Sequence, residues 1–213
     1  MTAASTDAAR PSGPSASTKG DRTRRRLLDA AAAEVARHGR AGASLTAIAA
    51  AAGLKPGSIY FHFGSRDQLI DAMLEEGVRE SLARLDQALA AVNPAHSQAQ
   101  PADPRARLRA AIRAHLDALA DLRDYAAVVL APALARDEPP GAAFRALRGA
   151  YLRQWSALVA DAQAAGVLAA GVPARTVRDL LIGALNQAGL AGRPPAETAA
   201  AVERLILLPP DPA

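Results

Sequence analysis

The chain has 213 residues, of which 50% are hydrophobic, and its formal net charge is +4. This length can bury one large core or two small ones. The chain contains no cysteine, which excludes a disulfide framework and any thiolate metal site and fits a reducing compartment. Its first residues lack the apolar region of a signal peptide, and no run of about 18 apolar residues occurs, so we expect a cytoplasmic protein without a membrane span.

The composition predicts an all-α protein. Ala, Leu, Arg and Glu dominate, and the alternating runs of Val, Ile, Tyr and Thr that would predict strands are missing. Much of the hydrophobic half is alanine, so closely packed helices are expected. We find no internal repeat of the length that predicts a solenoid.

Basic charge is concentrated in the N-terminal part of the chain. Residues 10–66 carry ten Lys or Arg and three acidic residues, a net charge of +7 that exceeds the +4 of the whole chain. Such segregation is typical of a module that binds a polyanion. A solvated, arginine-rich surface is the alternative that charge alone leaves open.

The first elements can be followed in chain order. Residues 1–20 are mostly small or polar, and we expect a flexible, disordered arm. From Thr23 the pattern becomes helical, and this helix is expected to end at Gly39 in a left-handed conformation. A second helix begins at Ser44, a good N-cap, and ends at Gly53.

The next two helices differ in length. The third is short, because Pro56 suits its first position and Gly64 follows it. Ser65 and Gln68 form a predicted capping box, which opens a long connecting helix over residues 67–92.

The segment NPAHSQAQPADP, residues 93–104, breaks the helical pattern and is the predicted loop between two regions. Periodic apolar residues then predict five more helices. They begin at Asp103-Pro104, span about 123–131 up to an interruption at Pro132, run from about Phe144 to Gly166, and span about 173–189 and 195–208.

Two short helices joined by a glycine turn are the arrangement of a helix-turn-helix, whose second helix enters the DNA major groove. Ala49 and Ala52 are small enough to let the two helices cross closely, and Gly53 tolerates the backbone angles of a tight turn. Residues 55–58, KPGS, are narrow and polar, so backbone amides there can reach phosphate. The apolar bulk of the short helix is expected from Ile59, Tyr60 and Phe63.

These residues resemble a known family. The segments SLTAIA, AGL, GSIYFHF and SRDQL, which begin at Ser44, Ala52, Gly57 and Ser65, are similar to the N-terminal signature of TetR/AcrR-type transcriptional regulators. The resemblance implies a three-helix, homeodomain-like DNA-binding domain over residues 21–66. It also implies a helical effector-binding and dimerisation domain over residues 93–209, after the connecting helix.

The resemblance implies which residues contact DNA. Residues matching Tyr60 and His62 contact the DNA backbone, and the basic residue matching Arg66 contacts phosphate. Gly57 lets the short helix approach the groove, and Phe63 packs in the three-helix core. The complete expected set of DNA-contacting residues is Ser44, Thr46, Lys55, Pro56, Gly57, Ser58, Tyr60, Phe61, His62 and Arg66.

Two positions depart from the family pattern. Lys55 replaces the usual serine or threonine cap, and Ala50 and Ala51 replace polar residues of the preceding helix. Lys55 can still contact phosphate or guanine, whereas the alanines reduce the number of base-reading groups. Taken alone, Tyr60 could instead be a core ring with a wet hydroxyl. Arg22, Arg24, Arg25 and Arg26 could form either a solvated helix face or a site of nonspecific phosphate attraction.

The last two helices predict a homodimer. They have more apolar side chains than one core needs, so pairing with a second copy is expected, and burial within one chain is the alternative. The candidate interface residues are Val177, Leu181, Leu185, Val202, Leu205 and Ile206.

By the same resemblance, a mostly apolar pocket for a small apolar or amphipathic effector is expected in the C-terminal region. Ligand would favour a dimer geometry in which the two recognition helices no longer match successive major grooves, transmitted through the connecting helix. The candidate pocket residues are His115, Tyr125, Tyr151, Gln154, Trp155 and Asn186, each of which could otherwise be an ordinary core or surface residue.

We therefore expect a ligand-responsive repressor that binds a palindromic operator in double-stranded DNA. An activator of the same family, or a helical-bundle interaction protein that does not bind DNA, is the alternative. An enzyme is not expected, because the four histidines have no paired metal spacing and the glycine-rich and nucleophile motifs of common enzymes are missing. We expect no catalytic residue, metal or cofactor.

Overall fold

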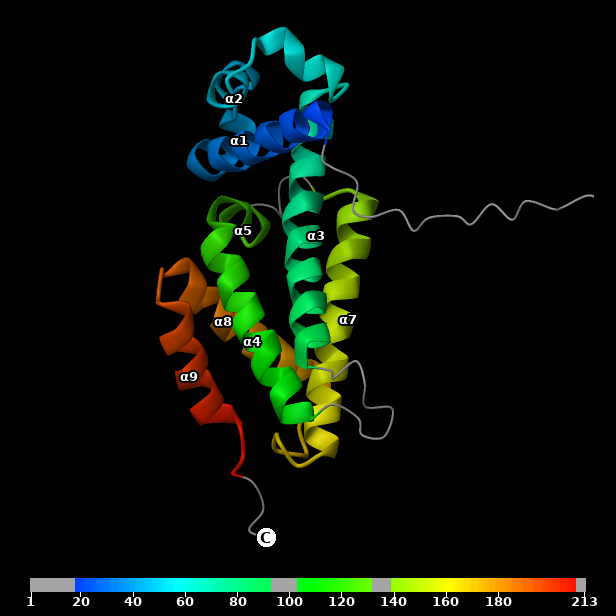
Figure 1. The fold of residues 1–213 in the computed structure, drawn as a ribbon, viewed down its shortest axis with the longest axis vertical. Coiled ribbons are helices and arrows are strands. Elements are labelled where there is room, and N and C mark those ends of the chain that lie inside the picture. Colours follow the sequence, from blue (N-terminus) through cyan, green and yellow to red (C-terminus); the bar gives the residue numbers. More distant parts are fainter. Residues whose placement is uncertain (1–17, 93–102, 132–138, 210–213) are drawn as a thin grey trace, which may run out of the picture.

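The computed structural model describes residues 18–92, 103–131 and 139–209. Every regular element in these ranges is helical, which confirms the all-α prediction (Figure 1). None of the described helices is both long enough and apolar enough to cross a membrane. Most of the expected N-terminal arm and inter-region loop, and the interruption at Pro132, lie outside the described residues.

Three elements form a unit at one end of the molecule (Figure 1). They are α1 (Lys19–Gly42), α2 (Leu45–Ala51) and the 3-10 helix η1 (Pro56–Phe61). Ser44 caps α2, because its hydroxyl accepts a hydrogen bond from the Ala47 amide, as predicted. Gly53 follows α2 with a φ of +66°, the left-handed conformation expected of the turn.

The ends of α1 differ from the sequence prediction. The helix begins at Lys19 rather than Thr23, because Thr18 and Asp21 form a reciprocal capping box. Gly39 has the expected left-handed φ of +70°, but a further turn continues beyond it to Gly42, so the glycine makes a kink rather than an end.

The connecting helix α3 (Arg66–Val92) runs from this unit through the rest of the molecule (Figure 1). Ser65 Oγ accepts a hydrogen bond from the Gln68 amide at 3.1 Å, as predicted. The Gln68 side chain, however, accepts from the Gly64 amide at 2.9 Å instead of completing the box at Ser65. A Cβ at position 64 would lie 2.9 Å from Gln68 Oε1, so glycine makes this contact possible.

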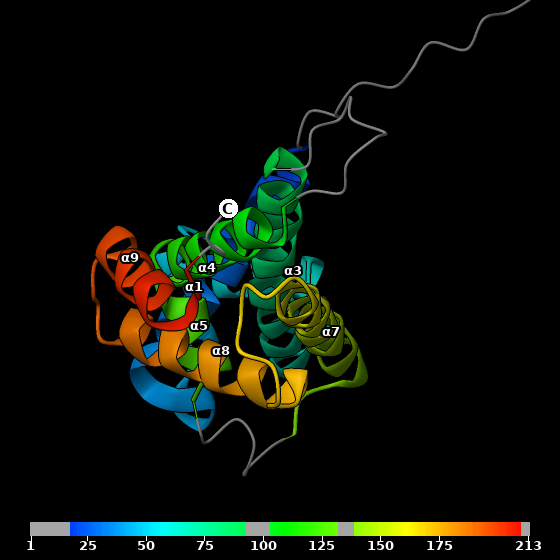
Figure 2. The ribbon, with the colours of Figure 1, turned by 90° about the horizontal axis from the view of Figure 1, so that it is seen from below.

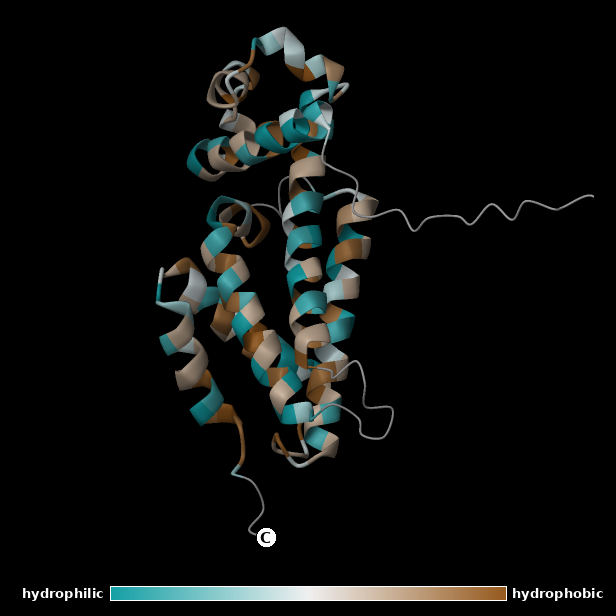
Figure 3. Ribbon diagram, viewed as in Figure 1, coloured by the Kyte–Doolittle hydropathy of each residue, from teal (hydrophilic) through white to brown (hydrophobic). Residues whose placement is uncertain are grey.

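The C-terminal region is a helical bundle packed around α3. Its described helices are α4 (Pro104–Asp121), α5 (Arg123–Val129), α7 (Ala142–Ala164), α8 (Ala174–Leu190) and α9 (Pro195–Ile206). α4 and α7 pack against α3, α8 packs against α4 and α7, and α9 packs against α4 (Figure 2). Hydrophilic and hydrophobic positions intermix along the helices, as expected of helices with one buried face (Figure 3).

The buried apolar side chains form two cores. The N-terminal core includes Leu27, Ile48, Ile59, Phe63, Leu69 and Met73, and it extends to Leu122, Tyr125, Val128 and Phe144. The C-terminal core includes Leu85, Ile112, Tyr151, Trp155, Ile182 and Leu185. Both cores include residues of α3, and the boundary between them falls between Val78 and Leu85. Tyr125 and Val128 of α5 belong to the N-terminal core, together with residues of α1, α2 and η1.

We expect Gly53→Ala to destabilise the protein. An alanine at a φ of +66° costs about 1–2 kcal/mol, and its Cβ would lie 2.7 Å from Arg26 Nη2, which donates to the Ala52 carbonyl. Gly57→Ala is the matched control, because Gly57 has no positive φ and no atom within 4 Å of an added Cβ. Urea unfolding compares the two variants with wild type, and an unchanged midpoint for Gly53→Ala would show that the turn does not need glycine.

Candidate nucleic-acid interface and effector pocket

The short helix η1 carries two exposed rings. It is a 3-10 helix, in which the His62 amide donates to the Ile59 carbonyl at 2.9 Å. A 3-10 helix has about three residues per turn, so only one residue in three faces the core. Ile59 is fully buried, whereas Tyr60 is 60% exposed and Phe61 is 89% exposed. The expectation that Tyr60 adds to the apolar bulk of this helix is therefore wrong, and so is the alternative of a core ring.

Phe63, the third ring of this stretch, follows η1 and anchors it to the core. It is buried in the N-terminal core, as the resemblance implied. The Arg24 guanidinium lies 4.5 Å from the centre of the Phe63 ring, a cation–π contact. Arg26 donates to the Ala52 carbonyl at the end of α2. Side chains of α1 thus support both sides of the turn between α2 and η1.

The arginines of α1 have an internal role that the sequence alternatives did not include. Besides the contacts of Arg24 and Arg26, Arg25 pairs with three carboxylates. Its guanidinium lies 3.1 Å from Asp29, 3.1 Å from Glu76 and 2.6 Å from Glu80. Part of the basic charge of the N-terminal segment is therefore balanced within the chain.

The residues expected to contact DNA lie around α2, η1 and the start of α3, at the free end of the molecule (Figure 1). Ser44, Thr46, Lys55, Pro56, Gly57, Tyr60 and Phe61 are exposed, and Ser58, His62 and Arg66 are half-buried. Exposure makes these contacts possible, and their existence stays a prediction.

Arg66 has a structural role that the sequence did not reveal. Its Nε donates to the Ala43 carbonyl at 3.1 Å, and another guanidinium nitrogen donates to the Arg40 carbonyl. The third nitrogen lies 3.6 Å from the Asp67 carboxylate. The two carbonyls belong to the end of α1, so Arg66 ties the start of α3 to that end. Arg66 is half-buried with these contacts in place, and its expected phosphate contact stays a prediction.

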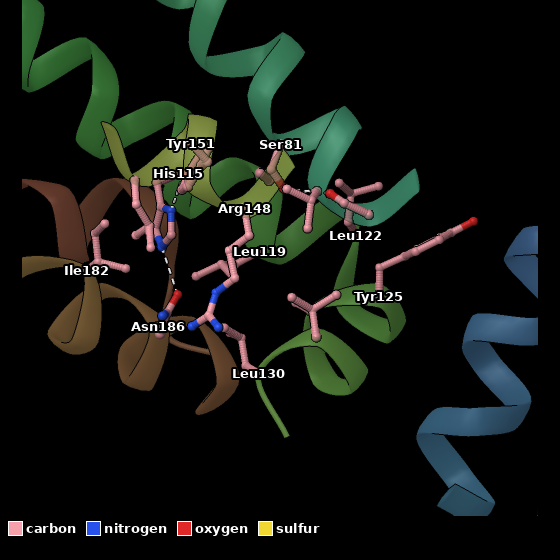
Figure 4. A pocket seen from close by; sticks show the side chains of 16 residues that line it. Ser81, His115, Leu119, Leu122, Tyr125, Leu130, Arg148, Tyr151, Ile182 and Asn186 are labelled. Carbon is pink, nitrogen blue, oxygen red and sulfur yellow. Dashed lines mark hydrogen bonds between the residues drawn. The ribbon is translucent and has the colours of Figure 1, made fainter. Parts of the chain in front are cut away.

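A cavity of about 100 Å³ lies where the two cores meet (Figure 4). Val78, Leu122 and Tyr125 line it from the N-terminal core, and Tyr151 and Ile182 line it from the C-terminal core. Most of the lining is apolar, and no acidic side chain is among the described lining residues.

A hydrogen-bonded chain of three side chains forms part of the cavity wall. His115 Nδ1 lies 2.6 Å from the Tyr151 hydroxyl, and His115 Nε2 lies 3.0 Å from Asn186 Oδ1. An amide oxygen only accepts, so Nε2 carries the hydrogen and the Tyr151 hydroxyl donates to Nδ1. Burial lowers the pKa of His115 to about 4, although the Asn186 hydrogen bond acts in the opposite direction. The imidazole is therefore neutral near pH 7.

Four of the six expected pocket residues, His115, Tyr125, Tyr151 and Asn186, line the cavity. Trp155 does not, because it lies one turn further along α7 inside the C-terminal core, with its ring edge-on to His115 at 5.8 Å between centroids. Gln154 is also outside the lining, because its amide donates to Asp86 of α3 at 2.6 Å.

Arg148 is a lining residue that the sequence did not reveal. It lies on α7, three residues before Tyr151, and Figure 4 shows its guanidinium reaching toward Asn186. Arg148 forms no ion pair or hydrogen bond with the described part of the chain. Its helical spacing from Tyr151 is the sequence signal that could have found it.

The expected dimer residues divide into buried and exposed. Leu181 and Leu185 are 6% and 0% exposed in the C-terminal core, so their expected subunit contact is wrong and burial within one chain is correct for them. Val177, Val202 and Ile206 pack against the same core and are partly buried. Leu205 is exposed, and so is Leu180. The helices have apolar residues on more than one face, which is why the pattern did not separate the two groups.

Comparison with known families and proteins follows the same division of the chain. Residues 27–73 match a family described as bacterial regulatory proteins, tetR family, and residues 101–189 match the tetracyclin repressor-like C-terminal domain. The HTH-type transcriptional regulator BetI of Paraburkholderia phytofirmans is 32% identical over 95 residues, 45% of this chain and 45% of that protein. The chain therefore aligns with less than half the length of this relative.

Two solved structures share the fold. The ketosteroid transcriptional regulator KstR2 of Mycobacterium tuberculosis has a TM-score of 0.70 at 20% identity, covering 87% of this chain and 95% of that chain. The transcriptional regulator FadR of Bacillus subtilis, in complex with stearoyl-CoA, has a TM-score of 0.62 at 16% identity, covering 85% and 96%.

Together the fold and the two sites define an all-helical helix-turn-helix protein with a cavity between its two cores. The two family matches cover both of these parts. The chain belongs to the TetR family of transcriptional regulators. This membership places it among regulators rather than enzymes, as the sequence predicted.

We expect His115 to make stability depend on pH. Its folded-state pKa of about 4 lies below the ordinary 6.5, so protons bind the unfolded chain first. The stabilisation is complete above pH 6.5 and is lost as the pH falls toward 4, a change that approaches about 3 kcal/mol. Urea unfolding at about pH 7 and pH 4.5 measures the loss. His115→Gln lacks the titrating group, so its loss should be smaller, and equal losses would exclude this role of His115.

Proposed function

We propose that the chain is a transcriptional repressor that acts in the cytoplasm, binds a palindromic operator in double-stranded DNA as a homodimer, and is released by a small amphipathic effector. The observation that carries the DNA-binding part is the pair of neighbouring exposed rings, Tyr60 and Phe61, on a braced helix at the free end of the molecule. Single exposed apolar residues are common, but two adjacent large rings favour a surface that has a partner.

The chemistry of this end suits duplex DNA. The Tyr60 hydroxyl can donate to a phosphate, and the Phe61 ring can contact a thymine methyl group. Lys55 is exposed beside them and forms no ion pair with the described residues, so its charge is available to the DNA backbone. Gly57 has open space where a Cβ would be, so no side chain keeps the η1 backbone from the groove.

Two exposed leucines support the homodimer. Leu180 of α8 is 70% exposed and Leu205 of α9 is 84% exposed. A second copy that covers α8 and α9 would remove them from water and generate a two-fold assembly. Two-fold symmetry matches the two half-sites of a palindrome.

The free polar groups of the cavity favour a ligand with an acceptor oxygen. The Tyr151 hydroxyl and the His115 Nε2–H are both used within the wall. The Asn186 amide nitrogen and the Arg148 guanidinium form no hydrogen bond with the described residues, so both can donate to a ligand. Because Arg148 is the only charged group among the described lining residues, which include no acid, a carboxylate or similar anion is favoured over a cation.

The size of the cavity favours a ligand that also extends outside it. A volume of about 100 Å³ holds roughly three waters. Arg148, Asn186 and Leu152 also line an open groove of about 670 Å³ between α7 and α8. An amphiphile can therefore place apolar atoms in the cavity and its head group beside Arg148. B. subtilis FadR, which has a similar fold, was solved with stearoyl-CoA, a ligand of this amphipathic kind.

DNA binding can be tested with the DNA upstream of the gene that encodes the chain. Tyr60→Ala should lower the affinity roughly tenfold or more, because it removes a hydrogen bond to a charged phosphate. Lys55→Gln should reduce the slope of log K against log salt by about 0.9 for each phosphate that Lys55 neutralises. Fluorescence anisotropy at several salt concentrations measures both effects.

The control for these variants is Arg153→Gln, which removes an exposed charge from α7, outside the DNA-binding unit and outside the proposed dimer surface of α8 and α9. Its affinity and salt slope should equal those of wild type. All of these side chains are exposed, so thermal unfolding should be unchanged. Wild-type affinity in both Tyr60→Ala and Lys55→Gln would refute the proposed DNA surface.

The ligand class can be tested with octanoate, 1-octanol and octylammonium, which share an apolar chain and differ in head group. Octanoate should raise the midpoint of thermal unfolding most and octylammonium least. Arg148→Met should reduce octanoate affinity roughly tenfold or more, since it removes a charge-assisted hydrogen bond. Arg153→Met on the same helix, outside the cavity lining, is the matched control. Equal stabilisation by all three compounds would contradict the preference for an anion.

A further inference from the structure

Tyr125 touches both the cavity and the DNA-binding unit. Its side chain is 5% exposed and lines the cavity from α5. Its hydroxyl donates to Asp29 Oδ1 of α1 at 2.7 Å. Figure 4 shows the ring directed away from the cavity with its hydroxyl toward α1. A single side chain thus forms part of the cavity wall and a hydrogen bond to the first helix.

Asp29 connects this hydrogen bond to a wider charge network. Its carboxylate lies 3.1 Å from Arg25, which also pairs with Glu76 and Glu80 of α3. The network therefore joins α5, α1 and α3 at one point. Burial, followed by the hydrogen bond to Asp29, raises the pKa of Tyr125, so the phenol keeps its proton and remains a donor to a charged acceptor.

The ring of Tyr125 has little room on the side of α3. A Cβ at Gly77 would lie 3.1 Å from both the Cβ and the Cδ1 of Tyr125. The glycine lets the ring pack directly on the α3 backbone, so the ring cannot move further toward that helix. A group that fills the cavity and displaces the ring must therefore move it away from its present position on Gly77, which changes the geometry of the hydrogen bond to Asp29.

We infer that Tyr125 is the positioning residue through which filling of the cavity changes the orientation of α1. The Tyr125–Asp29 hydrogen bond holds α1 in the orientation seen here, and a cavity occupant weakens that bond by displacing the ring. This route runs through α5 and differs from transmission along α3 alone. It rests on the proposed function, because it gives the cavity and the DNA surface a shared element whose state both can bias.

The test fills the cavity by substitution, so it does not depend on the identity of the effector. Ser81 of α3 lines the cavity, and Ser81→Leu places a larger apolar side chain there. Hydrogen–deuterium exchange of the α1 amides and DNA affinity are measured for Ser81→Leu with and without Tyr125→Phe. Ser81→Leu alone should increase α1 exchange and weaken DNA binding roughly fivefold or more. In the Tyr125→Phe background both effects should largely disappear.

Tyr151→Phe is the matched control, because Tyr151 also lines the cavity but its hydroxyl faces His115 rather than α1. It should leave the α1 response to Ser81→Leu intact. Asp29→Ala removes the acceptor of the same hydrogen bond at a half-exposed position, so it should also abolish the response of α1 to Ser81→Leu. This variant keeps the test possible if Tyr125→Phe does not fold.

An equal α1 response with and without the Tyr125 hydroxyl would overturn the inference. Measuring α1 exchange and DNA affinity separately also distinguishes a failure of this inference from a failure of the proposed function. A chain that does not bind DNA, but whose α1 exchange still depends on Tyr125, would refute the proposed function and leave this coupling in place.

Discussion

The arrangement of this molecule depends on one apolar core that does not follow the order of the chain. Ile59 and Phe63 from the DNA-binding unit are buried in the same cluster as Val128 of α5 and Phe144 of α7. Burial of apolar surface is the main favourable contribution to folding, so the unit that carries η1 is stabilised partly by α5 and α7. A change in the packing of α5 should therefore alter the packing of α1 as well, even if α3 does not change.

The scarcity of aromatic residues gives each ring a definite role. With 3% aromatic residues, the helices are separated mainly by alanine and leucine, which permit close crossings. Phe63 and Phe144 fill the N-terminal core, and Trp155 fills the C-terminal core. Against this background the exposure of Tyr60 and Phe61 is costly unless another surface covers them. Packing within the fold does not explain the exposure of these two side chains, and this is the reason for proposing them as DNA contacts.

Local chemistry explains which features could be predicted from the sequence. Ser44 caps α2, Gly53 adopts the left-handed turn, and Pro56 occupies the first position of η1, each as predicted. All three roles depend only on residues close by in the sequence. The contacts of Arg66 with α1 and the bond between Tyr125 and Asp29 join residues far apart in the chain, and one sequence has no signal for such pairs. The same limit applies to Leu181 and Leu185, since their apolar character fits a core and a subunit interface equally.

Because the cavity lies between the two cores, filling it can change how the two cores pack against each other. Its walls come from both, and its volume is smaller than the roughly 300 Å³ at which ligand sites usually begin. An effector whose apolar part is larger than the cavity must therefore move at least one wall, even if its head group lies in the groove beside Arg148. The C-terminal wall is fixed by the His115 chain, in which each hydrogen bond satisfies a buried group. The N-terminal wall at Tyr125 ends in a half-exposed carboxylate that keeps its Arg25 partner when the phenol leaves. Displacement is therefore expected to be less costly on the side that leads to α1, which is why we propose that a cavity occupant acts on the DNA-binding unit.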